Sequence, residues 1–176
     1  DALSIASKIN LEGKITADGT EVQHYIVATG GTFNLAADKT FNTVQVAGTF
    51  AANDADVTLS VLDVKKGGTA TVNDGTLNVT TLQTVTGAAV SVNDGTLATS
   101  LTGLGLTYDA TKGFTSVAAG TEGAGKVAAN TITLESGSLL DVDLGSVTEV
   151  QTAQLDKLTG LVATTSTGLV DIGATK

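Results

Sequence analysis

The sequence predicts an all-β fold, a β-solenoid with a repeat of about 20 residues, followed by a short C-terminal helix. Three observations support this prediction. Thr and other β-branched residues are abundant beside 21 Gly and no Pro, a composition typical of strands joined by tight turns. Apolar and polar residues alternate in several short segments. A six-residue segment also recurs at a spacing of twenty positions.

The N-terminal part begins with an ambiguous segment. Residues 1–10, in which Leu3, Ile5 and Ile9 are apolar, could form a short helix, but their periodicity is too short to decide. Residues 22–29 then alternate with period two, which predicts a strand with His24 half-buried between Val22 and Ile26. The sequence Gly-Thr-Phe at 31–33 and again at 48–50 marks the approach to two predicted turns.

The repeat is clearest between residues 52 and 97. Val-Asn-Asp-Gly-Thr-Leu occupies 72–77 and again 92–97, and 52–57 is a degenerate copy of it. Further upstream, 37–41 and 17–20 carry a related turn. We interpret one Asp in each copy as the turn-forming residue, at positions Asp18, Asp38, Asp54, Asp74 and Asp94.

Two architectures are compatible with this period. In a solenoid each repeat is one coil of short strands, and equivalent positions stack at the strand spacing of about 4.8 Å. In a hairpin array or β-sandwich, Asp-Gly instead closes an antiparallel pair. We favour the solenoid, because identical turns suit stacked coils and because Gly67-Gly68 and Gly87 supply a second corner in each period. Parallel pairing of Val72 with Val92 would confirm it.

The chain changes character after residue 102. We predict a repeat-containing β domain at 1–102, a Gly/Ala-rich connection at 103–130 and a β-rich segment with a short helix at 131–176. Within the last segment, 131–134 and 139–144 are predicted strands. Residues 150–158 are the predicted helix, with Gly160 as its stop signal.

Composition and charge exclude several classes of function. All nine basic residues are Lys, the formal net charge is −9 and no basic cluster occurs, so nucleic-acid binding is not expected. The longest apolar runs are a few residues, too short for a membrane-spanning helix, and we expect no membrane insertion. With no Cys and one His, we predict no enzymatic activity and no cofactor, apart from the calcium alternative below.

The repeated Asp is the strongest candidate for a ligand-binding residue in this sequence. In a solenoid, Asp54, Asp74 and Asp94 form a column, and such a column of carboxylates invites Ca²⁺. The favoured interpretation is turn formation, in which each Asp stabilises a bend beside Gly. The Gly-Gly-x-Gly-x-Asp motif of calcium-binding β-rolls is absent.

Other polar residues have structural interpretations. Asn53, Asn73 and Asn93 precede the column and are predicted to form an amide ladder between coils. Asp141 and Asp143 alternate on a predicted strand and are interpreted as a solvated face rather than as catalytic carboxylates. The aromatic residues are thinly spread in the sequence, which gives no sign of a stacking platform for sugars; Phe33, Phe41 and Phe50 are predicted core residues.

Three resemblances accompany these patterns. Residues 31–101, and above all the segment 68–80 with its Val-Asn-Asp-Gly-Thr-Leu turn, resemble coils of β-helix passengers of autotransporters and filamentous-haemagglutinin-like adhesins. Residues 150–165 resemble a spacer of phage tail-fibre and virion structural proteins, with Gln154 and Asp156 in place of the usual Glu and Asn. The composition resembles that of S-layer proteins. These resemblances imply an extracellular or virion scaffold, and no functional residue is carried over from them.

The predicted function is therefore structural. We expect a non-enzymatic subunit of a surface fibre, adhesin stalk, S-layer or virion fibre at the cell or virion surface, which associates with copies of itself through its β edges. The alternative is a fibre module that binds carbohydrate or a host receptor, which predicts an exposed aromatic or Asn/Asp cluster along one face. A polysaccharide-degrading β-helix enzyme is a less favoured third interpretation.

Overall fold

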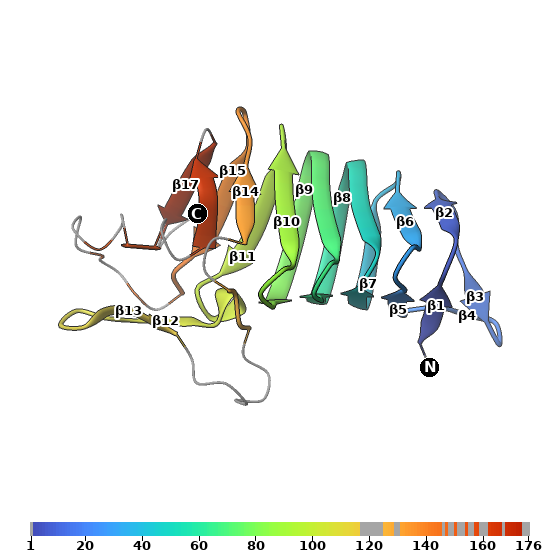
Figure 1. Cartoon of the computed structure of the whole chain (residues 1–176), viewed down its shortest axis with the longest axis horizontal. Coiled ribbons are helices and arrows are strands. Elements are labelled where there is room, and N and C mark those ends of the chain that lie inside the picture. The colour runs from blue at the N-terminus through green and yellow to red at the C-terminus, as the bar shows by residue number, and fades with distance from the viewer. Residues whose placement is uncertain are drawn as a thin grey trace.

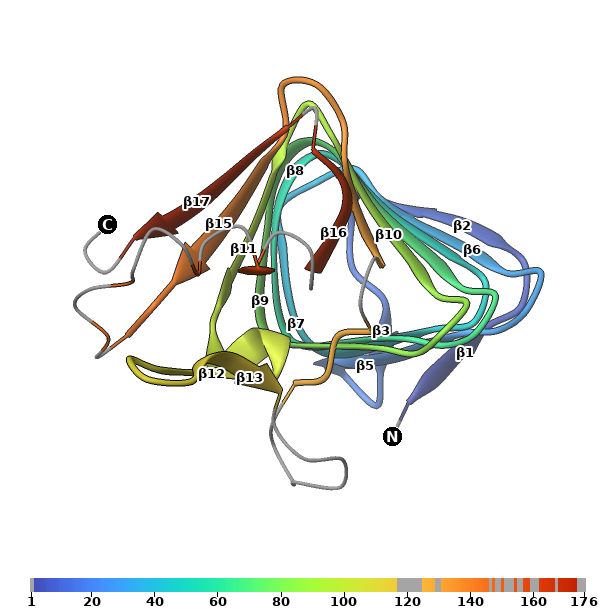
Figure 2. The same ribbon diagram turned by 60° about the vertical axis from the view of Figure 1, so that its left-hand side comes forward.

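The protein is a β-solenoid of about five turns, built from a parallel sheet that winds around one core. This computed structural model describes residues 2–116, 125–128, 131–145 and 168–173, the segment 162–166, and positions 147, 150, 154, 157 and 158. Figure 1 shows the strands stacked side by side along the long axis. Figure 2 looks more nearly along that axis and shows that each coil is roughly triangular.

Each complete coil has three faces, which we call A, B and C in chain order. The long strands β8 (Thr49–Val64) and β9 (Thr69–Thr84) pass through all three faces, and their pairing is interrupted at two corners, Asp54/Asp74 and Ser60/Thr80. Face A contains β2 (Lys8–Leu11), β6 (Thr32–Leu35), β10 (Ala89–Asn93), β14 (Ile132–Leu134), β16 (Ala163–Ser166) and residues 49–53 and 69–73.

The other two faces continue the same stack. Face B contains β11 (Thr96–Ser100), β15 (Leu139–Asp143), β17 (Leu169–Gly173), the first part of β7 (Lys39–Val46) and residues 55–59 and 75–79. Face C contains β1 (Leu3–Ile5), β5 (His24–Val27) and residues 43–46, 61–64 and 81–84. Together these strands form one 13-stranded sheet.

The pairing register confirms the solenoid and excludes the hairpin array. Val72 pairs with Val92 in parallel, as do Asn73 with Asn93 and Leu77 with Leu97. Strand β9 runs through Asp74-Gly75 without reversing, so this dipeptide forms a corner of the coil and closes no hairpin. The predicted strands at 131–134 and 139–144 are confirmed as β14 and β15.

Inward side chains form continuous apolar columns. Val57, Leu77, Leu97 and Leu140 lie in register on face B, and each is no more than 1% exposed. Val79 and Val92 are buried as well. Such columns stabilise the stack because each coil covers the apolar surface of its neighbour.

The N-terminal segment forms strands β1 and β2, which settles the ambiguity of residues 1–10 in favour of strands. Strands β3 (Thr16–Ala17) and β4 (Thr20–Glu21) then form a small antiparallel hairpin closed by Asp18-Gly19. Both turn residues have positive φ, as a type I′ turn requires. The same dipeptide therefore closes a hairpin here and forms a coil corner at 74–75.

A side arm interrupts the stack between faces B and C. After β11 the chain forms a 3₁₀ helix, η1 (Thr102–Leu104), and an antiparallel hairpin of β12 (Leu106–Asp109) and β13 (Gly113–Ser116). Lys126 then pairs with Gln83 in parallel, so 125–128 resumes face C. The predicted connection at 103–130 thus lies between two strands of one sheet, β11 and β14.

The short helix predicted at 150–158 lies largely outside the described residues and stays a prediction. No helix in the described part of the chain is long and apolar enough to cross a membrane.

Candidate functional site

The three predicted Asp residues form an exposed corner of the coil between faces A and B. Asp54, Asp74 and Asp94 adopt left-handed backbone conformations, with φ of 49°, 52° and 55°. Asp is among the few residues other than Gly that adopt this conformation readily. Asp54 is followed by Ala55, which has no positive φ, whereas Asp74 is followed by Gly75. The Asp, and not the Gly, is therefore the residue that is left-handed at every one of these corners.

The described residues contain no group of three or more His, Cys, Asp or Glu side chains placed to hold a metal ion. The left-handed conformation of Asp54, Asp74 and Asp94 agrees with the predicted role in turn formation. Calcium binding by this column stays a prediction, and a melting experiment described below tests it.

Other Asp residues bind the backbone of the next coil. The Oδ1 atom of Asp38 accepts a hydrogen bond from the Asp56 amide at 2.8 Å, and the Oδ1 atom of Asp56 accepts one from the Thr76 amide at 3.1 Å. Asp38 lacks the positive φ of the corner residues. The sequence grouped Asp38 with the corner series, but the structure gives it this different role.

The predicted amide ladder is present. Asn73 donates from Nδ2 to Oδ1 of Asn53 at 2.8 Å, and Asn93 donates to Asn73 at 2.9 Å. Asn34 and Asn10 make an equivalent bond at 2.8 Å. The ladder runs along the outside of face A and ties consecutive coils together.

Aromatic residues gather in two clusters, so the impression of thin spreading given by the sequence was wrong. Tyr25, Phe33, Phe41 and Phe50 pack inside the N-terminal coils, with the ring centroid of Tyr25 4.8 Å from those of Phe33 and Phe41. This confirms that the three Phe residues are core. The second cluster pairs Tyr108 with Phe114 at 5.0 Å across the β12–β13 hairpin.

His24 lies half-buried on the outer side of face C, in register with Thr43. The inward residues of its strand are Tyr25 and Val27, whereas Ile26 is 36% exposed. The half-buried state of His24 agrees with the prediction, but it arises at the outer surface of the coil.

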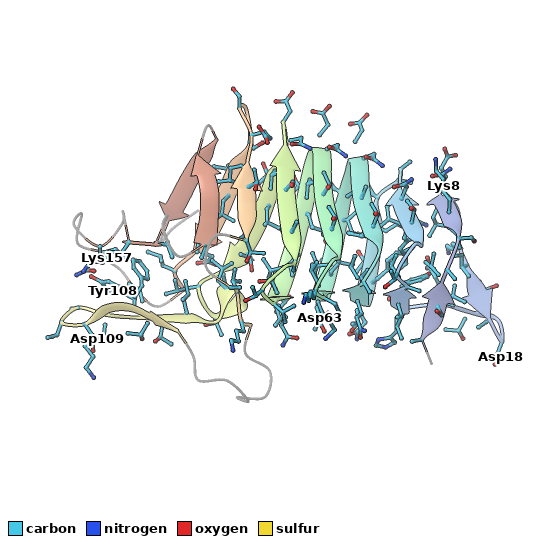
Figure 3. The ribbon with its side chains drawn as sticks, in the orientation of Figure 1. Lys8, Asp18, Asp63, Tyr108, Asp109 and Lys157 are labelled. Atoms are coloured by element: carbon cyan, nitrogen blue, oxygen red, sulfur yellow. The ribbon has the colours of Figure 1, made fainter. Side chains whose placement is uncertain are left out.

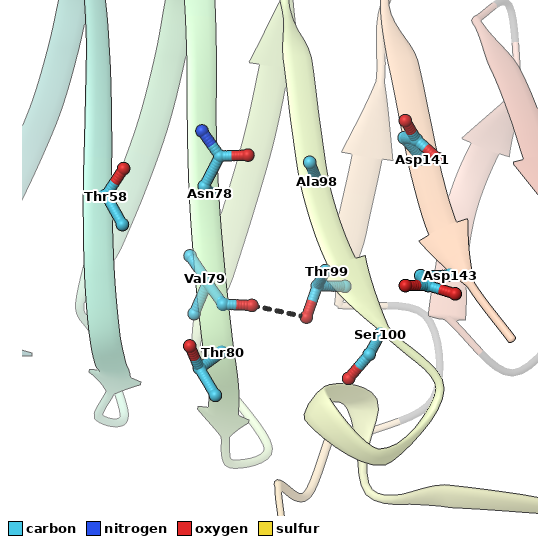
Figure 4. A pocket seen from close by; sticks show the side chains of 9 residues that line it. All are labelled: Thr58, Asn78, Val79, Thr80, Ala98, Thr99, Ser100, Asp141 and Asp143. Atoms are coloured by element: carbon cyan, nitrogen blue, oxygen red, sulfur yellow. Dashed lines mark hydrogen bonds between the residues drawn. The ribbon is translucent and has the colours of Figure 1, made fainter. Parts of the chain in front are cut away.

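The outer surface of face B carries an open groove of about 390 Å³, which we call the polar groove because most of its lining residues are polar, although apolar atoms contribute most of its lining surface. Figure 4 shows that it crosses β8, β9, β11 and β15, so that it runs along the solenoid and not along one strand. The groove is lined by Thr58, Asn78, Val79, Thr80, Ala98, Thr99, Ser100, Asp141 and Asp143.

The strand register explains the groove. Thr58, Asn78, Ala98 and Asp141 occupy equivalent positions on four neighbouring strands. Ala98 has the shortest side chain of the four, so the surface is hollow between the amide of Asn78 and the carboxylate of Asp141. Beside this row, Ser100 is in register with Asp143.

Backbone contacts fix the floor and one end of the groove. Thr99 turns its hydroxyl toward face B of the preceding coil and donates to the Val79 carbonyl at 2.7 Å (Figure 4). The Asp143 carboxylate accepts a hydrogen bond from the Gly145 amide at 2.8 Å, and the Ser100 hydroxyl accepts one from the Gly103 amide at 2.9 Å. These residues therefore hold the turns that leave face B.

The side arm adds a second hollow next to the groove. It has a volume of about 270 Å³ and shares Ser100 and Asp143 with the groove, and Tyr108 lines it from β12. Figure 3 shows Tyr108 and Asp109 on the arm that projects from the stack. Asp109 accepts hydrogen bonds from the amides of Lys112 and Thr111, which lower its pKa and fix the hairpin turn.

Sequence reasoning identified Asp141 and Asp143 as outward residues but missed the groove that contains them. Asn78 and Asp141 are far apart in the sequence, and the side arm lies between them. Alternation along a strand predicts that Asn78 and Asp141 point outward. Which strands pair, and therefore which outward side chains become neighbours, depends on how the whole chain winds.

The fold and these features define a β-solenoid with a corner of left-handed Asp residues, an amide ladder and a groove on face B. Comparison with protein-family models, with curated proteins and with solved structures finds no match in any of the three. The three resemblances noted in the sequence therefore stay predictions.

Proposed function

We propose that this protein is a non-enzymatic building block of an extracellular or virion surface assembly, and that copies of it associate end to end through the open edges of the solenoid. The observation that carries the proposal is the pairing at the two ends of the stack. Strands β1 and β2 at one end, and β16 and β17 at the other, each pair with one neighbour within the described part of the chain. Unpaired strand edges are templates for another strand.

The side chains at the β1–β2 end support the same proposal. Leu3 and Ile9 point inward, in register with the buried Tyr25 and Phe33. Ile5 and Leu11 on the same strands are buried, whereas Leu3 and Ile9 are only half-buried. A parallel strand of a second copy would pair with the backbone edge and would bury these apolar side chains.

The test compares two Ile-to-Lys variants by light scattering after gel filtration and by negative-stain electron microscopy. Ile9→Lys puts a charge at the open edge, a device that blocks strand pairing. Ile26→Lys places the same charge on β5, which is paired on both sides. The unaltered protein and Ile26→Lys are expected to form linear oligomers as concentration rises, whereas Ile9→Lys stays monomeric.

Melting midpoints of the two variants check that both are folded. The proposal fails if the unaltered protein remains a dispersed monomer at high concentration, or if folded Ile9→Lys assembles as well as Ile26→Lys.

A further inference from the structure

We infer that the polar groove on face B is a binding site for a linear, neutral glycan chain. This inference is separate from end-to-end association, because the groove lies on the flank of the stack, over β8, β9, β11 and β15. It names a ligand for the side of the solenoid, and it depends only on the residues that line the groove.

The floor of the groove is wide enough to seat a sugar ring. Asn78 and Asp141 are in register on either side of Ala98 and are therefore separated by two strand spacings, roughly 10 Å. A ring seated over the methyl group of Ala98 would place its hydroxyls between the Asn78 amide and the Asp141 carboxylate. The row continues past Asn78 to Thr58 on β8, so a chain that extends along the stack meets a further hydroxyl group there.

The lining chemistry selects a neutral, polyhydroxylated ligand. Hydroxyl groups of Thr58, Thr80 and Ser100 and the amide of Asn78 both donate and accept hydrogen bonds, whereas the carboxylates of Asp141 and Asp143 accept them. Hydrogen bonds from sugar hydroxyls to carboxylates are charge-assisted and therefore strong. No Lys lines the groove among the described residues, and two carboxylates repel an anionic sugar.

The side arm supplies an aromatic surface at one end. The hollow lined by Tyr108 shares Ser100 and Asp143 with the groove, so a chain that leaves the groove reaches Tyr108 next. Phe114 packs against Tyr108 and holds its ring in place. An aromatic ring beside polar groups is the usual composition of a small-molecule site, in which apolar area gives affinity and polar groups fix orientation.

The experiment measures binding of neutral tetrasaccharides, namely cellotetraose, chitotetraose and maltotetraose, by calorimetry and by saturation-transfer NMR on the unaltered protein produced in bacteria. Tetragalacturonic acid serves as the anionic comparison and CaCl₂ as the cation comparison. We expect at least one neutral chain to bind, with the anionic chain bound at least tenfold more weakly.

Two variants locate the site. Ala98→Ile fills the floor with a branched side chain that suits a strand, and Asn78→Ala removes one polar wall; each is expected to weaken binding at least tenfold. Ala89→Ile is the matched control, because Ala89 is an exposed residue on β10 away from the groove, and it should bind as the unaltered protein does. Melting midpoints establish that all three variants are folded.

Three results would overturn the inference: no binding of any neutral chain at millimolar concentration, equal binding by folded Ala98→Ile and Ala89→Ile, or binding of calcium alone. None of them bears on end-to-end association, which the Ile9→Lys comparison tests by oligomer size.

Discussion

At the scale of the residue, Tyr25 combines an apolar ring in the core with a buried hydroxyl group. Its side chain is 1% exposed among Phe33 and Phe41, and its hydroxyl has no hydrogen-bond partner among the described residues. Burial, with a smaller contribution from the nearby Glu21 charge, raises the pKa of Tyr25 from 10.0 to about 12. The ring contributes apolar contact, whereas the hydroxyl opposes folding because it leaves water without a compensating bond.

Replacing Tyr25 by Phe is expected to stabilise the protein by about 1 kcal/mol at neutral pH, because it removes this unsatisfied hydroxyl. Urea unfolding measures the change.

The pH dependence of stability gives a second readout. Since the folded-state pKa lies above the unfolded value, the stability linked to protonated Tyr25 is complete below pH 10 and is lost as the pH rises toward 12.

The Phe variant should lack this alkaline component, so the difference in unfolding free energy between the two proteins should widen from pH 8 to pH 11. A constant difference over that range would contradict the account of Tyr25.

At the scale of the element, the repeated corner combines two separate devices. The left-handed Asp at 54, 74 and 94 bends the chain, and the Asn that precedes each of them bonds to a neighbouring coil. Bending is local, whereas the ladder acts between coils. The six-residue repeat thus encodes both the shape of one coil and its attachment to the next.

Asn73 is the middle member of the ladder, since it donates to Asn53 and accepts from Asn93. Asn73→Ala is expected to lower the unfolding free energy by about 1–2 kcal/mol, and Asn93→Ala, which removes one bond, by about half as much. Asn78→Ala is the matched control on the same strand, outside the ladder, and should change stability by less than about 0.5 kcal/mol. Equal effects at positions 73 and 78 would show that the ladder contributes nothing.

The corner column makes a prediction about metal removal. If Asp54, Asp74 and Asp94 serve turn formation alone, the thermal midpoint is the same in EDTA and in millimolar CaCl₂. A cation bound only by the folded state would raise the midpoint, and more so as the CaCl₂ concentration rises above the dissociation constant. Differential scanning calorimetry in the two buffers decides between the turn and the calcium interpretations.

Much of the element structure could be predicted from the sequence, and the misses have physical causes. The duplicated segments 72–77 and 92–97 revealed the period, and the stacking of Val72 on Val92 follows from it. Asp-Gly, by contrast, formed a hairpin at 18–19 and a corner at 74–75, because the outcome depends on whether the next strand pairs with its own predecessor or with another coil. The groove depends on pairing across the side arm, which no local pattern records.

At the scale of the whole molecule, charge opposes the proposed assembly. The formal net charge is −9, so two copies repel each other as their ends approach. If the open edges bring copies together, salt should strengthen the association because it screens this repulsion. We expect the mean oligomer size in sedimentation velocity to rise from low to physiological ionic strength, and Ile9→Lys to show no such rise. A decrease with salt would point to contacts made by opposite charges.

The side arm has a wider consequence for how such a chain can change. Strands β10 and β11 stack on β14 and β15 although η1 and the β12–β13 hairpin lie between them in the sequence. The corner between faces B and C therefore accepts a long insertion while the coils on both sides keep their register. New loops can be acquired or grafted at that corner without redesigning the stack, which separates the evolution of a surface feature from that of the scaffold that carries it.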